Sequence, residues 1–306
     1  MPAYLWEVSL NVSNPSFSIV IPTYNHAHFL RTALDSIRAQ TFGDWEAIVV
    51  NNFSEDDTIA VVESYDDPRI RLVNFANHGV IAAARNHGLS LTQAPFVAFL
   101  DSDDFWYPEK LQLCLDKLAR DYDLVCHSEV WVGPGNHRRE VHYGPEARST
   151  YESMLLDGNC ISTSAVVVRR DWLERVGGFS VEPDFVTAED YELWLKLSRD
   201  GARIGFIDEV LGEYLIHDAN QSRSALRNMA AVSAVFEYHR KALKGRVTAR
   251  RLRRREALIL YSGARGLQDG GRYRQAWPLF FKAVMRYPLV PRFYAAMFFN
   301  AIGRRP

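Results

Sequence analysis

The sequence predicts a doubly wound α/β fold, with a mostly parallel central sheet and flanking helices, followed by a separate helical segment. Two observations support this prediction. Short runs of β-branched residues alternate with stretches of helical periodicity over residues 17–216, and polar residues cluster directly after several predicted strands. Of the 306 residues, 47% are hydrophobic and 24% charged, so the chain can bury a sizeable core.

Strand and helix alternate four times at the start of the chain. The first unit is the run FSIVIPT, followed by a helical pattern in which Leu30, Leu34 and Ile37 face inward. Strands joined through helices lie parallel, and ligands bind at the carboxyl ends of such strands. Strands are predicted over 17–23, 45–50, 70–75 and 96–100, and helices over 30–37, 55–65, 79–91 and 108–120.

The elements that follow are less regular. Residues 133–150 are rich in turn-forming residues and are expected to form a loop or a hairpin. Beyond residue 223, apolar residues recur at spacings of three and four, which is typical of helices. The other predictions are strands over 123–132 and 160–169, a short helix containing Trp172 and Leu173, a helix opening at 187–190, and a strand, turn and strand over 203–216.

Three carboxylates, Asp101, Asp103 and Asp104, follow the predicted strand 96–100. If the extended backbone continued past this strand, Asp101 and Asp103 would project to the same side. Like charges this close repel unless a cation intervenes, and oxygen ligands suit Mg²⁺ or Mn²⁺. A solvated acidic turn before the next helix explains the same residues equally well, so both interpretations stay open.

The three cysteines, Cys114, Cys126 and Cys160, show no C-x-x-C spacing. Neither a disulfide framework nor a zinc site is therefore predicted, and a reducing cytoplasm is the expected setting. The amino terminus lacks a basic segment followed by a long apolar one, and nowhere do about 18 apolar residues run uninterrupted. We expect no secretion signal and no membrane span.

Charge is unevenly distributed along the chain. Residues 221–306 contain 19 Lys and Arg but three acidic residues, whereas the whole chain has a net charge of -1. This asymmetry predicts a boundary near residue 222, between a body over 16–222 and a basic, aromatic-rich helical region over 223–306, and residues 1–15 are expected to form an N-terminal extension. The helical region, with its run Arg250–Arg255, either lies on an anionic membrane surface or packs on the body. No nucleic-acid-binding motif accompanies its charge, so nucleic acid is not an expected partner.

Six segments, met in order over roughly residues 16–224, resemble the family 2 glycosyltransferases with the Rossmann-like GT-A fold. The resemblance implies an inverting, metal-dependent hexosyl- or N-acetylhexosaminyltransferase. Such an enzyme moves a sugar from a nucleotide diphosphate to a saccharide or lipid-linked acceptor, here in bacterial surface polysaccharide assembly at the inner face of the cell membrane. The segments are FSIVIPTYN, VVNNFSEDDT, HGVIAAARNHGL, FVAFLDSDDFWYPEKL, GGF with AEDYELWLKL, and EYLIHDANQS.

The resemblance implies a nucleotide site built from the first strand–helix units. Pro22, Thr23 and Tyr24 match the loop that flanks the base, and the Tyr24 ring offers a stacking face. Asn51 stands where the family usually has an Asp that accepts from the base, which leaves the preference for uridine open, although a UDP-sugar is the expected donor. Arg85 matches an A-R-N segment and either binds the diphosphate or holds an acidic loop.

The resemblance also assigns the acidic run to a D-x-D motif. Asp101 and Asp103 then hold Mg²⁺ or Mn²⁺ on the diphosphate, with Asp103 as the direct ligand and His217 as a third one. Asp101 and Ser102 also contact the nucleotide, while Asp104 orients backbone or metal-bound water. The cation stabilises the charge that develops on the leaving group.

Asp190 matches the family's E-D motif, and the resemblance makes it the general base that takes the proton of the acceptor hydroxyl. Glu189 is the second candidate for this role. A capping interaction between Thr187 and Asp190 at the start of a helix is the structural alternative.

Two other functions stay open. A nucleotide-sugar-binding module without transferase activity is compatible with Asn51. Metal-dependent phosphoryl chemistry at the acidic run is the other possibility, although it needs a nucleophile or a second metal site that the sequence does not show.

Overall fold

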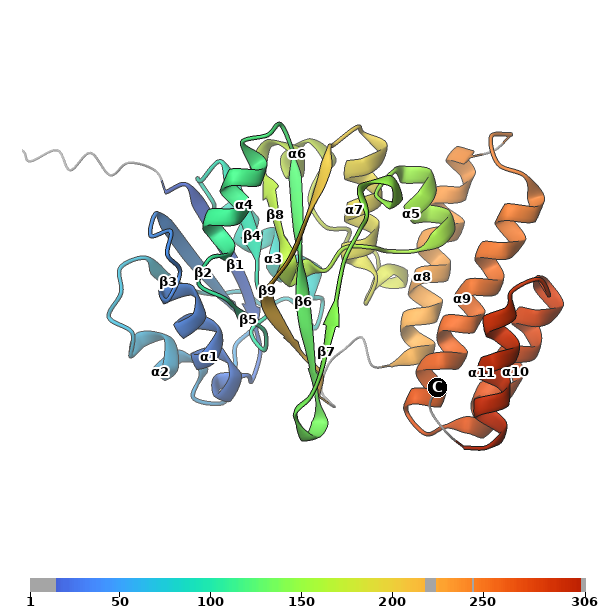
Figure 1. Cartoon of the computed structure of the whole chain (residues 1–306). Helices are drawn as coiled ribbons and strands as arrows, with labels where there is room; N and C mark the ends of the chain where they lie inside the picture. The colour runs from blue at the N-terminus through green and yellow to red at the C-terminus, as the bar shows by residue number, and fades with distance from the viewer. Residues whose placement is uncertain (1–14, 218–223, 244, 304–306) are drawn as a thin grey trace, which may run out of the picture.

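The computed structural model describes residues 15–217, 224–243 and 245–303. It shows an α/β body with a bundle of helices at one side of it (Figure 1). All nine strands of this part of the chain belong to one sheet. The predicted extension over 1–15, apart from its last residue, and the predicted boundary near 222 lie outside the described residues.

The parallel half of the sheet contains the first four strands: β1 (Phe17–Thr23), β2 (Trp45–Asn51), β3 (Ile70–Asn74) and β4 (Phe96–Phe99). Their spatial order is β3-β2-β1-β4. Strands β1 and β2 are almost entirely buried, as expected for parallel strands between helices. In the register, Thr23 pairs with Asn51, and Asn51 pairs with Asn74. The strand ends are therefore level, and the polar residues after them gather at one edge.

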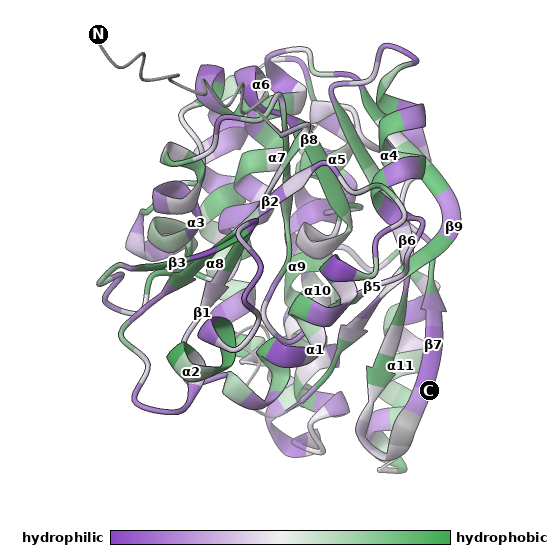
Figure 2. Cartoon of the chain, turned by 90° about the vertical axis from the view of Figure 1, so that its left-hand side faces the viewer, coloured by the Kyte–Doolittle hydropathy of each residue, from purple (hydrophilic) through white to green (hydrophobic). Residues whose placement is uncertain are grey.

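The other half is mixed and contains β5 (Phe105–Trp106), β6 (Leu124–Gly133), β7 (His137–Val141), β8 (Val166–Arg169) and β9 (Ile204–Leu215). Strand β8 is antiparallel to both β4 and β6, whereas β6 and β9 are parallel. Strands β6 and β7 form the hairpin that was one of the two options for residues 133–150. The exposed β7 appears hydrophilic at the edge of the sheet (Figure 2).

Two sequence predictions in this half were wrong. The expected strand, turn and strand over 203–216 is the single strand β9, which absorbs the irregularity as register shifts opposite Ser128. The strand expected over 160–169 is confined to β8, because the short 3-10 helix η3 (Thr163–Ala165) precedes it. The continuity of β9 and the late start of β8 depend on tertiary contacts, which cannot be predicted from hydrophobic periodicity.

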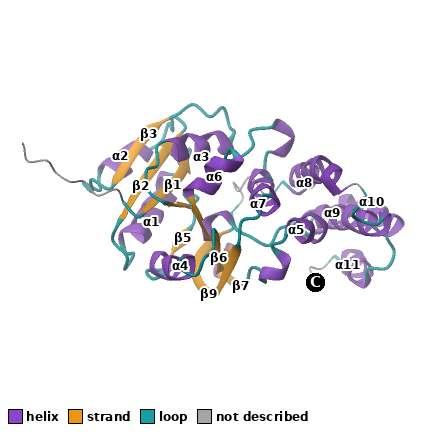
Figure 3. Ribbon diagram, turned by 90° about the horizontal axis from the view of Figure 1, so that it is seen from above, coloured by secondary structure: helices purple, strands orange, loops and turns teal. Residues whose placement is uncertain are grey.

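Helices cover both faces of the sheet: α1 (Ala27–Arg38), α2 (Thr58–Glu63), α3 (Ile81–Ser90), α4 (Lys110–Leu118), α5 (Tyr151–Asp157), α6 (Arg170–Val176) and α7 (Glu189–Arg199). One buried cluster joins α1, α2 and α4 to one face, and another joins α3, α5, α6 and α7 to the other. Figure 3 shows α1 and α4 opposite α3 and α6. The predicted α/β layering is present, and helix α5 is an element that the sequence did not reveal.

The helical region contains α8 (Ala225–His239), α9 (Ala249–Asp269), α10 (Tyr273–Arg286) and α11 (Pro291–Ala301). Val235 and Phe236 of α8 share one buried cluster with Trp194 of the body. Arg251 and Arg254 of α9 form ion pairs with Glu152 and Asp157 of α5. Much of the basic run therefore packs on the body, which was one of the two alternatives. Among the described helices, none is both long and apolar enough to cross a membrane.

Candidate active site

The loops after β1 and β2 meet at the level ends of these strands. The Ser54 hydroxyl accepts a hydrogen bond from the backbone N–H of Asn25 at 2.9 Å. Thr23 is buried at the end of β1, whereas Tyr24 is 50% exposed. Tyr24 is thus accessible at the position where the resemblance implies stacking on a nucleobase.

Asn51 is fully buried at the end of β2. Its side-chain oxygen accepts from the backbone N–H and the hydroxyl of Ser54, at 3.0 and 2.6 Å, and its amide nitrogen donates to Asn74 at 2.8 Å. Both lone pairs of that oxygen are therefore occupied within the protein. In this arrangement Asn51 shapes the loop 51–54, and Ser54 is a member of the site that sequence reasoning missed.

The acidic run Asp101–Asp104 is a turn, in which the Asp104 N–H donates to the Asp101 carbonyl at 3.0 Å. The expectation that an extended backbone places Asp101 and Asp103 on one side was therefore wrong. The two carboxylates have different partners, because Asp101 contacts Arg85 at 2.6 Å and Asp103 contacts His217 at 2.7 Å. Asp104 is buried and accepts from the backbone N–H of Leu215 at 3.0 Å, which agrees with its predicted role in orienting backbone.

Arg85 of α3 joins the acidic turn to the start of α7. It is buried, and its two terminal nitrogens reach Asp101 at 2.6 Å and Glu189 at 3.0 Å. Burial alone would lower the pKa of Arg85. The two carboxylates more than offset this effect and raise the pKa above its usual value, so the guanidinium stays charged. The second oxygen of Glu189 accepts from the Thr187 N–H at 2.8 Å. Both oxygens of Glu189 are thus engaged.

Asp190 lies beside this ion pair at the first turn of α7. Its Oδ2 accepts from the Thr163 hydroxyl at 3.1 Å. Burial, with the neighbouring Glu189, raises the pKa of Asp190 to about 6, although Arg85 opposes the shift. The capping box between Thr187 and Asp190 is not formed, since Ala188 is the N-cap of α7 and has no side-chain cap, although Asp190 Oδ1 accepts from the backbone N–H of Tyr191 at 2.6 Å in the first turn. Thr187 instead adopts a left-handed conformation with φ 84°, unusual for a β-branched residue.

Two histidines and Phe29 adjoin the acidic turn. His26 lies within hydrogen-bonding distance of the Ser102 hydroxyl, at 2.9 Å, and its ring centre is 6.0 Å from that of His217. Phe29 packs on His217 with ring centres 4.7 Å apart. Burial lowers the pKa of His26 against the opposing effect of Asp103. The sequence signal for His26 was its place directly after the first strand, in YNHAHF.

The chemistry of these side chains fits a divalent cation. Burial and the charge of Asp101 raise the pKa of Asp103, so the turn holds more negative charge than it can easily stabilise. Carboxylate oxygens are donors that suit Mg²⁺ and Mn²⁺. No group of three or more His, Cys, Asp or Glu converges into a complete site within 15–217, 224–243 and 245–303. Cations held on phosphates need one or two protein carboxylates, since the phosphates supply the other ligands.

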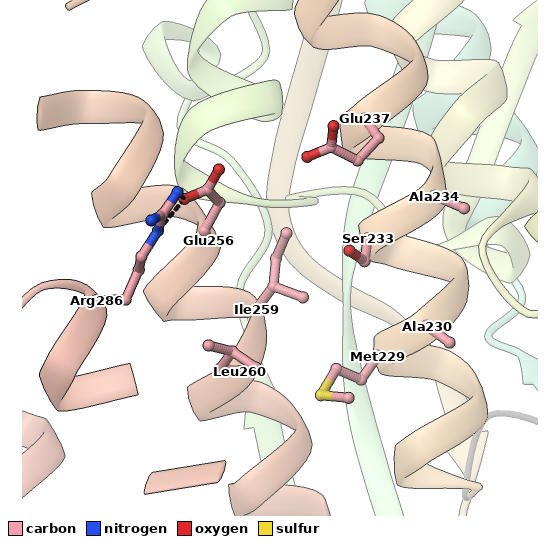
Figure 4. Close-up of a pocket in the computed structure, with 9 residues that line it drawn as sticks. All are labelled: Met229, Ala230, Ser233, Ala234, Glu237, Glu256, Ile259, Leu260 and Arg286. Carbon is pink, nitrogen blue, oxygen red and sulfur yellow. Dashed lines mark hydrogen bonds and ion pairs between the residues drawn. The ribbon is translucent and has the colours of Figure 1, made fainter. Parts of the chain in front are cut away.

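A cavity of about 560 Å³ lies in the helical region. Figure 4 shows its lining side chains on α8, α9 and α10, with Ile259 of α9 and Met229 of α8 between these two helices and the Arg286–Glu256 ion pair at one side. None of the predicted site residues lines it. The lining residues are Met229, Ala230, Ser233, Ala234, Glu237, Glu256, Ile259, Leu260 and Arg286.

A family model described as "Glycosyl transferase family 2" matches residues 18–177, which contain β1 to β4, the acidic turn and Arg85. The chain belongs to glycosyltransferase family 2. It is therefore a glycosyltransferase that uses a nucleotide-sugar donor, and the predicted family and class of enzyme are confirmed.

Two relatives of this family 2 glycosyltransferase have names that state a donor, an acceptor or a pathway. The UDP-Glc:alpha-D-GlcNAc-diphosphoundecaprenol beta-1,3-glucosyltransferase WfgD of Escherichia coli is 32% identical over 184 residues, which are 60% of this chain and 70% of the relative. The putative teichuronic acid biosynthesis glycosyltransferase TuaG of Bacillus subtilis is 29% identical over 73% of this chain and 87% of the relative.

Solved structures with the same fold confirm the GT-A prediction. Residues 1–349 of S. aureus TarS, in complex with UDP-GlcNAc, match with a TM-score of 0.65 over 95% of this chain and 89% of that one. The mannosyltransferase PcManGT from Pyrobaculum calidifontis, in complex with GDP-Man and Mn²⁺, matches with a TM-score of 0.61 over 95% of this chain and 86% of that one. Both are 19% identical, so the likeness concerns the fold.

Proposed function

We propose that this glycosyltransferase is a metal-dependent, inverting enzyme that moves a hexose or N-acetylhexosamine from a UDP-sugar to a lipid-linked saccharide. One observation carries the proposal. Arg85 holds the acidic turn and the start of α7 together through its ion pairs with Asp101 and Glu189. Candidate groups for the diphosphate and for the acceptor hydroxyl thus belong to one rigid arrangement at the ends of the parallel strands.

Asp190 acts as the general base in this proposal. The acceptor oxygen attacks C1 of the sugar, its proton passes to the Asp190 carboxylate, and the bond from C1 to the diphosphate oxygen breaks. Attack from the face opposite the leaving group inverts the configuration at C1. With a pKa near 6, Asp190 is ionised at neutral pH and is a stronger base than an ordinary aspartate. Glu189 is less suited, because its carboxylate is ion-paired with the Arg85 guanidinium, whereas the oxygens of Asp190 accept from neutral donors, the Thr163 hydroxyl and the Tyr191 N–H.

The donor lies along the strand ends. Pro22, Thr23 and Tyr24 flank the base, and Ser102 with Asp101 contacts the diphosphate. The residues that would hold Mg²⁺ or Mn²⁺ are Asp103, Asp101 and His217. Charge that develops on the departing diphosphate is offset by such a cation when it is bound. The Mn²⁺ and GDP-Man held by PcManGT and the UDP-GlcNAc held by TarS support this assignment by analogy.

The proposed lipid-linked acceptor is by analogy with WfgD, whose name gives an undecaprenol diphosphate sugar as its acceptor. Such an acceptor would bring the enzyme to the inner face of the cell membrane. Exposed apolar side chains on and after α10 support a peripheral contact there, and they include Phe281, Met285 and Leu289 beside Lys282. Co-sedimentation with anionic and with neutral vesicles tests this part, and an absence of binding to anionic vesicles would contradict it.

A donor panel tests the central proposal. Release of nucleotide from UDP-, GDP- and dTDP-sugars is measured with and without Mn²⁺, in the presence of undecaprenol diphosphate saccharides. We expect release with a UDP-sugar, dependent on both the cation and the acceptor. Donor binding without release in all combinations would favour the inactive binding module, and phosphate release without sugar transfer would favour phosphoryl chemistry.

A further inference from the structure

The short 3-10 helix η3 lies between the acidic turn and Asp190. Strand β8 pairs antiparallel with β4, and Ala98 is opposite Val167. The residues just before β8 therefore lie beside the residues just after β4. Thr163 and Ser164 of η3 are both buried, and neither was among the predicted site residues.

The Ser164 hydroxyl contacts both ends of the acidic turn. It donates to Asp104 Oδ2 at 2.5 Å and accepts from the backbone N–H of Asp101 at 3.1 Å. Asp104 is buried, and burial with the charges of Asp103 and Asp101 raises its pKa well above the usual range. The Ser164 hydroxyl therefore holds in place both the backbone of Asp101 and the carboxylate of Asp104, in the turn that carries the candidate metal ligands.

The backbone of Ser164 is fixed by side chains of β5 and α4. Its carbonyl accepts from Trp106 Nε1 at 2.8 Å and from Lys110 Nζ at 3.2 Å. Both donors are buried, and burial lowers the pKa of Lys110 to about 7. Buried groups with satisfied hydrogen bonds move little, so η3 is a rigid support.

The neighbouring residue reaches the candidate base. The Thr163 hydroxyl donates a hydrogen bond to Asp190 Oδ2 at 3.1 Å. The charged groups that act on Asp190 from adjacent positions are Glu189, which raises its pKa, and Arg85, which lowers it. The bond from Thr163 also lowers this pKa, because it stabilises the ionised carboxylate.

We propose that Thr163 and Ser164 form a positioning turn that holds the general base Asp190 in a fixed relation to the acidic turn Asp101–Asp104. This inference rests on the proposed function of Asp190. An acceptor oxygen reacts only when the base and the donor sugar are aligned around it, and a misplacement of about 1 Å costs about 100-fold in rate. Arg85 links the acidic turn to α7 through ion pairs with Asp101 and Glu189. The helix η3 links the same two elements through the neutral hydroxyl groups of Thr163 and Ser164.

Thr163→Val tests the contact with the base, because valine keeps the shape of threonine and removes the donor. We expect kcat/KM to fall about tenfold and the acid limb of its pH profile to move to higher pH, since the ionised form of Asp190 loses a hydrogen bond. Thr163→Ser should restore both. The matched control is Thr92→Val, which removes a buried hydroxyl bonded to the Leu89 carbonyl. A Thr163→Val profile equal to that of the control would overturn the inference.

Ser164→Ala tests the contact with the acidic turn. We expect the KM for the donor to rise about tenfold, while the acid limb stays where the wild-type enzyme has it. Ser36→Ala is the control, because Ser36 is equally buried and bonds the Ala33 carbonyl. Equal donor KM values for the two variants would contradict the proposed role of Ser164. If Ser164→Ala does not fold, the Thr163 variants decide the inference.

The wild-type enzyme separates this inference from the function on which it rests. If no donor and no lipid-linked acceptor supports transfer, the proposed function fails. If the wild type is active and Thr163→Val and Ser164→Ala match their controls, only the positioning turn is refuted.

Discussion

At the scale of single residues, Asp190 combines partial burial with a hydrogen bond and a neighbouring ion pair. Asp190→Asn keeps the size of the side chain and removes the base. We expect kcat to fall by about 10²–10⁴, because general-base catalysis contributes about this much. Binding of UDP-sugar, measured by calorimetry, should persist. The exposed Asp184, in the segment before α7, provides the control Asp184→Asn, and a near-normal rate for Asp190→Asn would remove Asp190 from the mechanism.

The raised pKa of Asp190 predicts the pH dependence of the wild-type enzyme. The base must be ionised to accept a proton, so kcat/KM should be constant above the pKa, which is about 6, and should fall with acid below it. Steady-state rates between about pH 4.5 and 8 give the profile. An acid limb near the pKa of an ordinary aspartate, about 3.9, would show that burial and Glu189 do not control the base.

Among single residues, sequence reasoning found those whose type is itself unusual at their position. Asp101 and Asp103 were singled out because carboxylates directly after a buried strand need a partner, whereas Asp190 was proposed from the family resemblance alone. Thr163 and Ser164 were not recognised, because small hydroxyl residues before a strand are common. The partner of Ser164, Asp104, also lies 60 residues away in the sequence.

At the scale of elements, Arg85 links α3 to the acidic turn and to α7. Arg85→Met should destabilise the protein by about 3–5 kcal/mol, because it leaves the buried Glu189 without its counter-charge. Arg203→Met is the control, since Arg203 pairs with Asp121 on the surface, where an ion pair contributes at most about 1 kcal/mol. Denaturant unfolding measures both, and equal losses would mean that the buried pairs are no stronger than a surface contact.

The elements themselves were predicted where periodicity is clear. Strands β1 to β4 and the helices between them match because β-branched runs alternate with amphipathic segments. The length of β9 and the direction of β8 escaped prediction. Bulges let a strand continue through a sequence that resembles a turn, and the pairing direction of a strand depends on distant partners.

At the scale of the whole molecule, the body and the helical region share a core. Phe236 of α8 is fully buried in the cluster that contains Trp194. Phe236→Ala should cost about 3–5 kcal/mol, whereas Phe281→Ala, at an exposed side chain of α10, should cost less than about 0.5 kcal/mol. We expect calorimetry to show one unfolding transition for the wild type and for both variants. Two separate transitions would mean that the regions unfold independently.

The hydrogen bond between Asn228 and Thr187 limits which C-terminal helices a chimaeric protein could carry. Asn228 in the first turns of α8 donates to the Thr187 carbonyl at 2.9 Å, and this holds a backbone conformation that threonine rarely adopts. The helical region thus supplies one of the supports of the residue that precedes the Glu189–Asp190 pair by two positions. A chimaera that takes its C-terminal helices from another member would need a hydrogen-bond donor at this position, or a glycine in place of Thr187, to keep the same loop.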